Sequence, residues 1–455
     1  MIKIRCQDNY MKDNKNYGLF TTISMIIGIV IGSGIIFKTG NVLKATNGNV
    51  FLGVLVFVFA SLAIIFGSLT LSQLALRSNE HGGIISYTKE SYGKSASGVL
   101  GWFISLVYFP TITAVLSWVS SVYLLMFLGI SASLEFQILV AIGLLISLSL
   151  LNIISAKASG FFQNFATIVK IIPLLLIALI GFFSKSNEVL TVQNNFTSGL
   201  NANVLMFLTA IGPISFIFDG WTVSTTISGE IKNPKKTLPI ALAISPILIL
   251  LIYILYFVGV TKVMDVNEII GLGNDYIYVA FSRLLGDFGS KVLLFILVIS
   301  MLGTTNGLVL GFSRTLNHLS HEDLIFLSKK IKSPLNKLPI KAIIYSGFMT
   351  MFWLFIHYIT MKFKLLNHSD VSEISIATLY LLLIFLYVKV MSLAKAGEIK
   401  GFFKGYAFPI LAIIGSLIMF SGSLQNKYFL IYFGFSLLIL LISYFYLKNK
   451  AKTEK

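Results

Sequence analysis

Long apolar segments separated by short polar stretches dominate this chain. A helix that crosses a bilayer needs roughly 20 mainly apolar residues, and this length criterion predicts twelve spans. The predicted spans are 18–43, 50–76, 97–127, 134–154, 162–183, 203–228, 239–261, 288–312, 341–361, 371–390, 406–424 and 429–447. The connections between them are short, so the pattern predicts an all-α membrane protein with no separate soluble domain.

The composition agrees with this pattern. Of the 455 residues, 56% are apolar and 12% are charged, whereas a soluble protein has about 25% charged residues. The single cysteine, Cys6, excludes a disulfide framework and a thiolate metal cluster. The five histidines lie at span ends or in loops. We therefore expect no enzymatic activity, no cofactor and no metal site.

The net charge of +17 indicates how the spans are oriented. Of the 35 basic residues, 25 fall on the side of the N-terminus, nine fall on the other side, and Lys170 lies inside a span. Because cytoplasmic loops carry the excess of Lys and Arg, both termini are expected in the cytoplasm. The positive charge is therefore loop charge beside lipid and does not indicate nucleic-acid binding. The polar first seventeen residues contain no secretory signal peptide.

Two spans contain residues that interrupt a helix. The first span has Gly28, Gly32 and Gly34 around its middle, and each glycine costs about 1 kcal/mol relative to alanine in a helix interior. The sixth span contains a proline followed by Asp219 and Gly220. Paired interruptions in corresponding spans are typical of transporters built from two inverted repeats.

The chemistry of such a break suits a zwitterion. Backbone groups freed at membrane depth are tolerated only where they face a polar cavity or a ligand. The N–H groups that open the second half-helix attract a carboxylate, and the carbonyls that end the first half attract an ammonium. An α-amino acid carries both groups. The alternative is that Gly32-Ser33-Gly34 only lets two helices approach closely.

Asp219 is a carboxylate placed at membrane depth, where charge is costly and usually functional. Its expected role is to support the site as an N-cap, by accepting hydrogen bonds from the N–H groups that open the second half of the sixth span. The alternative is that Asp219 titrates and carries a proton.

Several motifs resemble the amino acid–polyamine–organocation (APC) superfamily, and within it the bacterial relatives of the L-type amino acid transporters. The resemblance covers about residues 18–400 and departs from the family at His321–Phe326. The matching segments are Gly32-Ser-Gly-Ile35, His81-Gly-Gly-Ile-Ile-Ser-Tyr-Thr-Lys-Glu90, Phe216-x-x-Asp-Gly-Trp221, Gly229-Glu-Ile-Lys-Asn-Pro-Lys-Lys-Thr-Leu-Pro239, Gly303-x-x-Asn-Gly307 and Ser313-Arg314.

The resemblance implies roles for individual residues. The substrate carboxylate would meet Ser33 and the backbone N–H groups of Gly34 and Ile35, and the ammonium would meet carbonyls of Val30, Phe216 and Asp219. Phe216 would act as a gate over the substrate, although one phenylalanine among 38 is otherwise a packing residue. The full set of expected substrate-binding residues is Val30, Gly32, Ser33, Gly34, Ile35, Phe216, Phe218, Asp219 and Gly220.

Lys170 lies near the middle of the fifth span, too deep for its side chain to reach the interface comfortably. Carbonyls at the first break and hydroxyls such as Ser300 or Thr304 are candidate acceptors for its ammonium group. L-type relatives carry a lysine here, where sodium-coupled members of the fold bind sodium, so the resemblance implies sodium-independent transport. Lys170 would either lock two helices together or load and release a proton; a lysine buried by chance at a helix crossing is the alternative.

The expected protein is thus an APC permease that transports neutral amino acids by alternating access, as an exchanger or a proton symporter. We expect it to lie in a bacterial plasma membrane, in contact with the lipid bilayer. It would bind an amino acid as its substrate and, if it is a symporter, H+ as well. The sequence does not indicate an oligomeric state. A polyamine, organic-cation or cationic amino acid permease is the alternative. The expected layout is a cytoplasmic tail at 1–17, five-helix repeats at 18–183 and 203–390, helices 11 and 12 at 406–447, and a cytoplasmic tail at 448–455.

Overall fold

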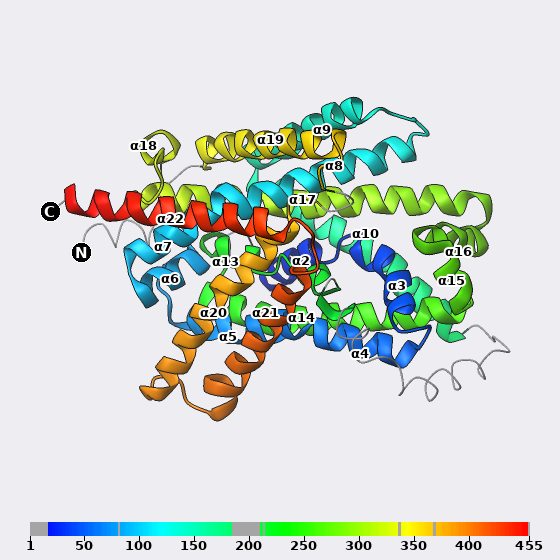
Figure 1. Cartoon of the computed structure of the whole chain (residues 1–455), viewed down its shortest axis with the longest axis horizontal. Helices are drawn as coiled ribbons and strands as arrows, with labels where there is room; N and C mark the ends of the chain where they lie inside the picture. Colours follow the sequence, from blue (N-terminus) through cyan, green and yellow to red (C-terminus); the bar gives the residue numbers. More distant parts are fainter. Residues whose placement is uncertain are drawn as a thin grey trace.

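The computed structural model describes residues 17–80, 82–183, 210–212, 214–334, 338–366 and 370–453. Figure 1 shows a helical bundle in which several long helices run side by side along the longest axis of the molecule. Within the described residues the only strand-like pairing is one isolated parallel bridge, between Tyr17 and Ile231. The fold is therefore all-α, as the apolar pattern predicts.

The helices have the following bounds: α2 (Leu19–Val30), α3 (Gly34–Ala45), α4 (Val50–Ala60), α5 (Leu62–Arg77), α6 (Ile84–Tyr92), α7 (Lys94–Phe103), the π-helical segment η1 (Ile104–Tyr108), α8 (Phe109–Phe127), α9 (Leu134–Ile154), α10 (Ala156–Phe183), η2 (Phe216–Phe218), α13 (Val223–Thr226), η3 (Ser228–Glu230), α14 (Pro234–Val263), α15 (Val266–Leu272), η4 (Gly273–Asp275), α16 (Tyr276–Leu285), η5 (Gly286–Phe288), α17 (Gly289–His321), α18 (Ser328–Ile331), α19 (Ile340–Lys362), α20 (Glu373–Lys395), η6 (Phe403–Ala407), α21 (Phe408–Ser423) and α22 (Phe429–Thr453).

Among the described residues, ten helices are long and apolar enough to cross a membrane, and the bent pair α2 and α3 makes an eleventh candidate span. Each of these eleven corresponds to a span predicted from the sequence. The sixth predicted span, 203–228, lies partly outside the described residues, so the count of twelve stays a prediction. The eighth span extends to His321, beyond its predicted end at 312. Its last turns are polar but bury Arg314 against protein, so a hydropathy criterion ends this span too early.

Burial separates the inner helices from the outer ones. The most apolar stretch of the span Lys94–Phe127 is 83% buried and that of Gly289–His321 is 67% buried, whereas the corresponding values are 22% for Leu134–Ile154 and 17% for Phe429–Lys450. The first two spans therefore form the centre of the bundle. The exposed apolar faces of α9 and α22 are suited to contact lipid.

Helix α17 packs closely against the broken helices because it carries glycines on one face. A Cβ atom at Gly307 would lie 2.4 Å from Ile29 of α2, and one at Gly311 would lie 2.3 Å from Val223 of α13. Both distances are too short for a real contact. Glycine is thus required for α17 to support the two segments that form the site.

The two ends of the bundle are built from different elements. Helices α6, α7 and α18 and the last turns of α22 gather at one end, and α3, α15 and α16 lie at the other (Figure 1). We call these the α6 end and the α3 end. At the α6 end the Lys450 ammonium donates to the backbone carbonyl of Asp323 at 2.7 Å, which fastens α22 to the segment after α17.

Candidate functional site

The first break lies between α2 and α3. Helix α2 ends at Val30, and Ile31 has an extended conformation with φ −74° and ψ 98°. Helix α3 then begins at Gly34, bent by 49° from α2. The N–H groups that open a helix have no partner within it, so the start of α3 presents donors at this position.

The second break lies between η2 and α13. Asp219 is extended, with φ −77° and ψ 163°, and Gly220 has a φ of +103°. A Cβ atom at Gly220 would also lie 2.6 Å from Ile29 Cγ2. Both the backbone angle and the lack of space therefore require glycine here.

The two breaks face each other across a short distance. A Cβ atom at Gly34 would lie 2.9 Å from Ile217 Cγ2, and Gly220 meets Ile29 in the same way. The buried Tyr253 hydroxyl lies 3.1 Å from the Ile217 carbonyl oxygen and 3.3 Å from that of Val30. Tyr253 thus connects the two unwound segments from α14.

A cavity of about 460 Å³ opens beside both breaks. Its lining residues are Ile29, Val30, Gly32, Ser33, Gly34, Lys38, Ile112, Val115, Leu116, Val119, Phe216, Ile217, Asp219, Gly220, Met301, Thr304, Leu308, Asp370, Ser372, Ile376, Gly422, Gln425 and Asn426. These include seven of the nine residues expected to bind substrate. The side chains of Ile35 and Phe218 are fully buried and do not line the cavity, although the expected role of Ile35 needs only its backbone N–H.

Asp219 is held by a tyrosine rather than by a helix N-terminus. Its Oδ2 accepts a hydrogen bond of 2.9 Å from the Tyr108 hydroxyl. Helix α13 begins only at Val223, after Thr222, and has no side-chain cap. The expected N-cap role is therefore wrong, because the backbone between Asp219 and α13 takes another turn. Tyr108 ends the π-helical segment η1, a type of distortion that is frequent at functional sites.

Lys170 is 3% exposed and lies against three oxygen atoms. Its Nζ donates to the Gly28 carbonyl at 2.6 Å, the Ser300 carbonyl at 3.0 Å and the Thr304 hydroxyl at 3.1 Å. Thr304 supplies its hydroxyl, as expected, whereas Ser300 contributes its backbone oxygen. One ammonium group therefore joins α2, α10 and α17 directly behind the first break.

Several residues of the site could not be found from sequence patterns. Tyr108 and Tyr253 are two of 19 tyrosines, and neither lies in a distinctive motif. The α8 residues that line the cavity belong to an ordinary apolar span. A hydroxyl group at membrane depth needs a partner, which marks buried tyrosines as a class but does not select these two.

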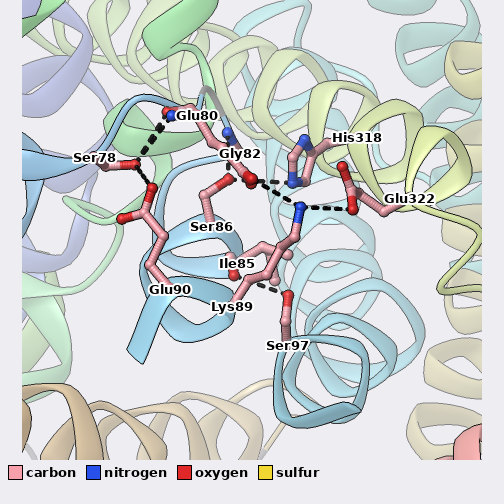
Figure 2. A network of polar contacts seen from close by, with 10 residues as sticks. All are labelled: Ser78, Glu80, Gly82, Ile85, Ser86, Lys89, Glu90, Ser97, His318 and Glu322. Atoms are coloured by element: carbon pink, nitrogen blue, oxygen red, sulfur yellow. Dashed lines mark hydrogen bonds and ion pairs between the residues drawn. The ribbon is translucent and has the colours of Figure 1, made fainter. Parts of the chain in front are cut away.

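Ion pairs close the α6 end of the molecule, away from the cavity. Figure 2 shows Lys89 of α6 between two carboxylates, Glu80 at 2.7 Å and Glu322 at 2.8 Å. Burial raises the pKa of Glu322, but the hydrogen bond and charge of Lys89 outweigh this effect, so its pKa is below the ordinary value. Burial likewise lowers the pKa of Lys89, and its two carboxylate partners raise it above the ordinary value.

Contacts around these pairs attach α6 to its neighbours. The Ser86 hydroxyl lies 3.2 Å from His318 Nε2 on α17, and the Ser97 hydroxyl of α7 donates to the Ile85 carbonyl (Figure 2). The stretch from His81 to Tyr92 is too polar to span a membrane, so the sequence predicts an amphipathic cytoplasmic segment here. Five consecutive residues of α6, 84–88, are buried in the structure. Helix α6 is therefore packed into the protein. The sequence favours a turn residue over a ligand for His81, which lies outside the described residues.

A second set of contacts closes the same end. Arg314 of α17 donates through Nε to Glu230 at 2.6 Å. The backbone of Tyr17 pairs with Glu230 and Lys232 at 3.0 and 2.8 Å. The segment that leads into α2 is thereby fixed to the segment that follows the second break.

These features define a class of protein: a polytopic membrane protein with a central cavity between two broken helices, open on one side and closed by ion pairs on the other. In the described residues no group of His, Cys, Asp and Glu is arranged to hold a metal ion. The family model for amino acid permeases matches residues 17–450. The chain belongs to the amino acid permease family, whose members are transporters and not enzymes.

Curated relatives are similar along most of the chain. The serine/threonine exchanger SteT of Bacillus subtilis is 28% identical over 426 residues, which cover 92% of each chain. The human cystine/glutamate transporter is 27% identical over 341 residues, covering 74% of this chain and 67% of the relative. The mouse Asc-type amino acid transporter 1 is 29% identical over 305 residues, covering 66% of this chain and 57% of the relative.

The fold also matches a solved structure. The crystal structure of MhsT in complex with L-phenylalanine has a TM-score of 0.60 and 15% sequence identity, covering 88% of this chain and 98% of that chain. At this identity the similarity supports the fold alone. The expected broken-helix fold is thereby confirmed, whereas the division into repeats stays a prediction.

Proposed function

We propose that this protein transports neutral amino acids across the bacterial plasma membrane by sodium-independent alternating access. Its two five-helix repeats, 18–183 and 203–390, would alternate around the cavity, with both termini in the cytoplasm. The open side of the cavity would then face outward, and the closed α6 end would face the cytoplasm. The distribution of basic residues supports this orientation.

The two breaks are the proposed site for the backbone of the amino acid. Its carboxylate would accept hydrogen bonds from Ser33 and the opening N–H groups of α3. Its ammonium would donate to the carbonyls of Val30, Phe216 and Asp219. The carbonyls of Val30 and Phe216 already have partners, Tyr253 and the Asp219 N–H; a carbonyl oxygen has two lone pairs, so each retains capacity for the substrate.

The contacts of Lys170 are the observation that supports sodium-independent transport. Its ammonium group is within 3.1 Å of three oxygen atoms from α2 and α17. Oxygen atoms gathered in this way are also ligands for a hard metal cation. We propose that the permanently attached charge of Lys170 takes the place of such an ion, so that no sodium is needed to join the two helices.

The coupling mode is proposed to be exchange. The similarity to a serine/threonine exchanger over 92% of the chain favours this mode. Proton symport is the competing mode, because both Asp219 and Lys170 carry groups able to take up or release a proton.

The test is uptake of labelled amino acids by purified protein in proteoliposomes, either empty or preloaded with amino acids. Uptake is expected only into preloaded vesicles, at the same rate in sodium and in potassium or choline buffer. Uptake into empty vesicles driven by an inward proton gradient would select symport. Strict dependence on sodium would contradict the role of Lys170.

A cationic substrate is the second candidate, because Asp370 lines the cavity in addition to Asp219. Lys38 lines the same cavity and opposes a positive charge. We therefore expect putrescine and arginine to be poor substrates. Putrescine uptake that exceeds uptake of every neutral amino acid would replace the first proposal with this one.

A further inference from the structure

The helices that complete the cavity present an apolar wall. Helix α8 contributes Ile112, Val115, Leu116 and Val119, which are spaced so that they share one helix face. Helix α17 adds Leu308 and α20 adds Ile376. We call these six residues the aliphatic wall. The side chains of these six residues consist of hydrocarbon groups and offer a ligand no hydrogen-bond donor or acceptor.

The polar groups of the cavity are located elsewhere. Ser33 and Asp219 belong to the breaks, where the substrate backbone is proposed to bind. Thr304 lies within 3.1 Å of the carbonyls of both Gly28 and Ser300 and also accepts from Lys170. Its hydroxyl is therefore committed to the contact behind the first break. The other polar lining residues come from α3 and from the loops before α20 and after α21.

Met301 connects the aliphatic wall to the first break. The Ser33 hydroxyl donates to the Met301 sulfur at 3.6 Å, and the Met301 Cε lies 3.2 Å from where a Cβ of Gly32 would be. A thioether is only a weak acceptor, so a substrate carboxylate is a better partner for Ser33. Methionine is also flexible and adapts to irregular spaces. Met301 therefore limits the space between the bound backbone and the wall.

We infer that the site selects amino acids with aliphatic side chains, such as valine, leucine, isoleucine and methionine, over those with hydroxyl or charged side chains, and that Met301 sets the upper size limit. This inference rests on the proposed function. It assigns to this chain a preference different from the one in the name of its serine/threonine exchanger relative. The reason is that a hydroxyl against the aliphatic wall would lose its hydrogen bonds to water without replacement.

The test compares valine with threonine, which are close in size and differ in a hydroxyl group. Initial uptake rates are measured in preloaded proteoliposomes for labelled valine, leucine, threonine, serine, phenylalanine and arginine. Valine is expected to exceed threonine in kcat/KM by about tenfold to a hundredfold, because an apolar pocket discriminates such a pair by at most about a hundredfold. A thermal-shift titration of the wild-type protein with valine and threonine gives the same comparison without transport.

Two variants test the assigned residues. Val115→Thr introduces a hydroxyl into the wall and is expected to raise the ratio of threonine uptake to valine uptake about threefold or more. The control is Val260→Thr, at a buried position on α14 outside the cavity, which is expected to leave this ratio unchanged. Met301→Ala is expected to raise the ratio of phenylalanine uptake to leucine uptake about fivefold. The matched control Met419→Ala removes a fully buried methionine on α21 that does not line the cavity.

The outcomes separate the inference from the proposed function. If threonine is taken up as fast as valine or faster, the inference is wrong, but the proposed transport function still holds. If Val115→Thr changes the valine preference no more than Val260→Thr does, the assignment of the wall is wrong. If Met301→Ala leaves phenylalanine uptake unchanged, the assignment of the size limit is wrong. Absence of flux for every amino acid overturns the proposed function itself.

Discussion

At the scale of single residues, two charged groups at membrane depth are stabilised in different ways. Lys170 donates to three oxygen atoms, two of which are backbone carbonyls. Asp219 accepts from one tyrosine hydroxyl and also lines the cavity. Lys170 is thus fully occupied by protein, whereas Asp219 combines a protein contact with access to a ligand.

Replacing Lys170 tests its contribution to both stability and transport. Lys170→Met keeps most of the side-chain volume but leaves the Gly28 carbonyl with one weaker partner and the Ser300 carbonyl without the ammonium. A hydrogen bond from a charged group contributes about 1.5–3 kcal/mol, so we expect a lower Tm in detergent and uptake reduced more than tenfold. The exposed Lys341→Met near the start of α19 serves as the control. A wild-type Tm and rate for Lys170→Met would show that this contact is dispensable.

Tyr108 is the positioning residue for Asp219. Tyr108→Phe removes the hydroxyl that donates to Oδ2 at 2.9 Å, and a hydrogen bond to a charged group contributes about 1.5–3 kcal/mol. We expect a higher KM for the transported amino acid and a smaller change in maximal rate. The control is Tyr345→Phe, a half-buried tyrosine on α19 outside the cavity. Equal KM values for both variants would show that Tyr108 does not position Asp219 for substrate binding.

At the scale of elements, the site depends on helices that stop and restart in two places. The breaks meet because Gly34 contacts Ile217 and Gly220 contacts Ile29. Helix α17 supports both from behind, and α14 bridges them through Tyr253. The location of each break was predictable from glycine and from the sequence around Asp219. Their contact with each other was not, because it depends on the packing of α14 and α17.

Gly220→Ala tests the contact between the breaks. The substitution strains a backbone with φ +103° and places a Cβ atom 2.6 Å from Ile29. We expect loss of transport and a Tm lower by several degrees in detergent. Gly347→Ala is the matched control, because its Cβ meets nothing within 4 Å on the regular helix α19. Transport by Gly220→Ala at the control rate would show that the second break tolerates rearrangement.

At the scale of the whole molecule, the closed end is held by contacts between distant elements. Lys89 joins α6 to Glu322 after α17, and Arg314 joins α17 to Glu230 after α13. A transporter that alternates between two open states must break such contacts in each cycle. The partly exposed Lys89–Glu322 pair is suited to this, because such a pair contributes only about 0.2–1 kcal/mol.

The Lys89–Glu322 pair predicts a pH dependence of stability. Because the pKa of Glu322 is lowered from 4.5 in the folded protein, its contribution is fully present above pH 4.5 and is lost as the pH falls through the lowered value. Because the pKa of Lys89 is raised from 10.5, the pair persists below pH 10.5 and is lost at higher pH. The Tm difference between wild type and Glu322→Gln is therefore expected to be constant between about pH 5 and 10. A difference that does not begin to shrink as the pH falls below 4.5 would exclude the ion pair as its cause.

The amino-acid sequence alone predicts the apolar spans, the position of both breaks and the presence of Lys170 inside a span. These features follow from local patterns, since hydrophobic length and helix-breaking residues act over a few neighbouring positions. Which side chains meet depends on packing between distant segments: Tyr108 reaches Asp219 from 111 residues away, and Lys170 reaches Gly28 from 142 residues away. The aliphatic wall belongs to the same category. Which face of an apolar helix lines a cavity depends on its neighbours, because lipid and protein interior accept the same side chains.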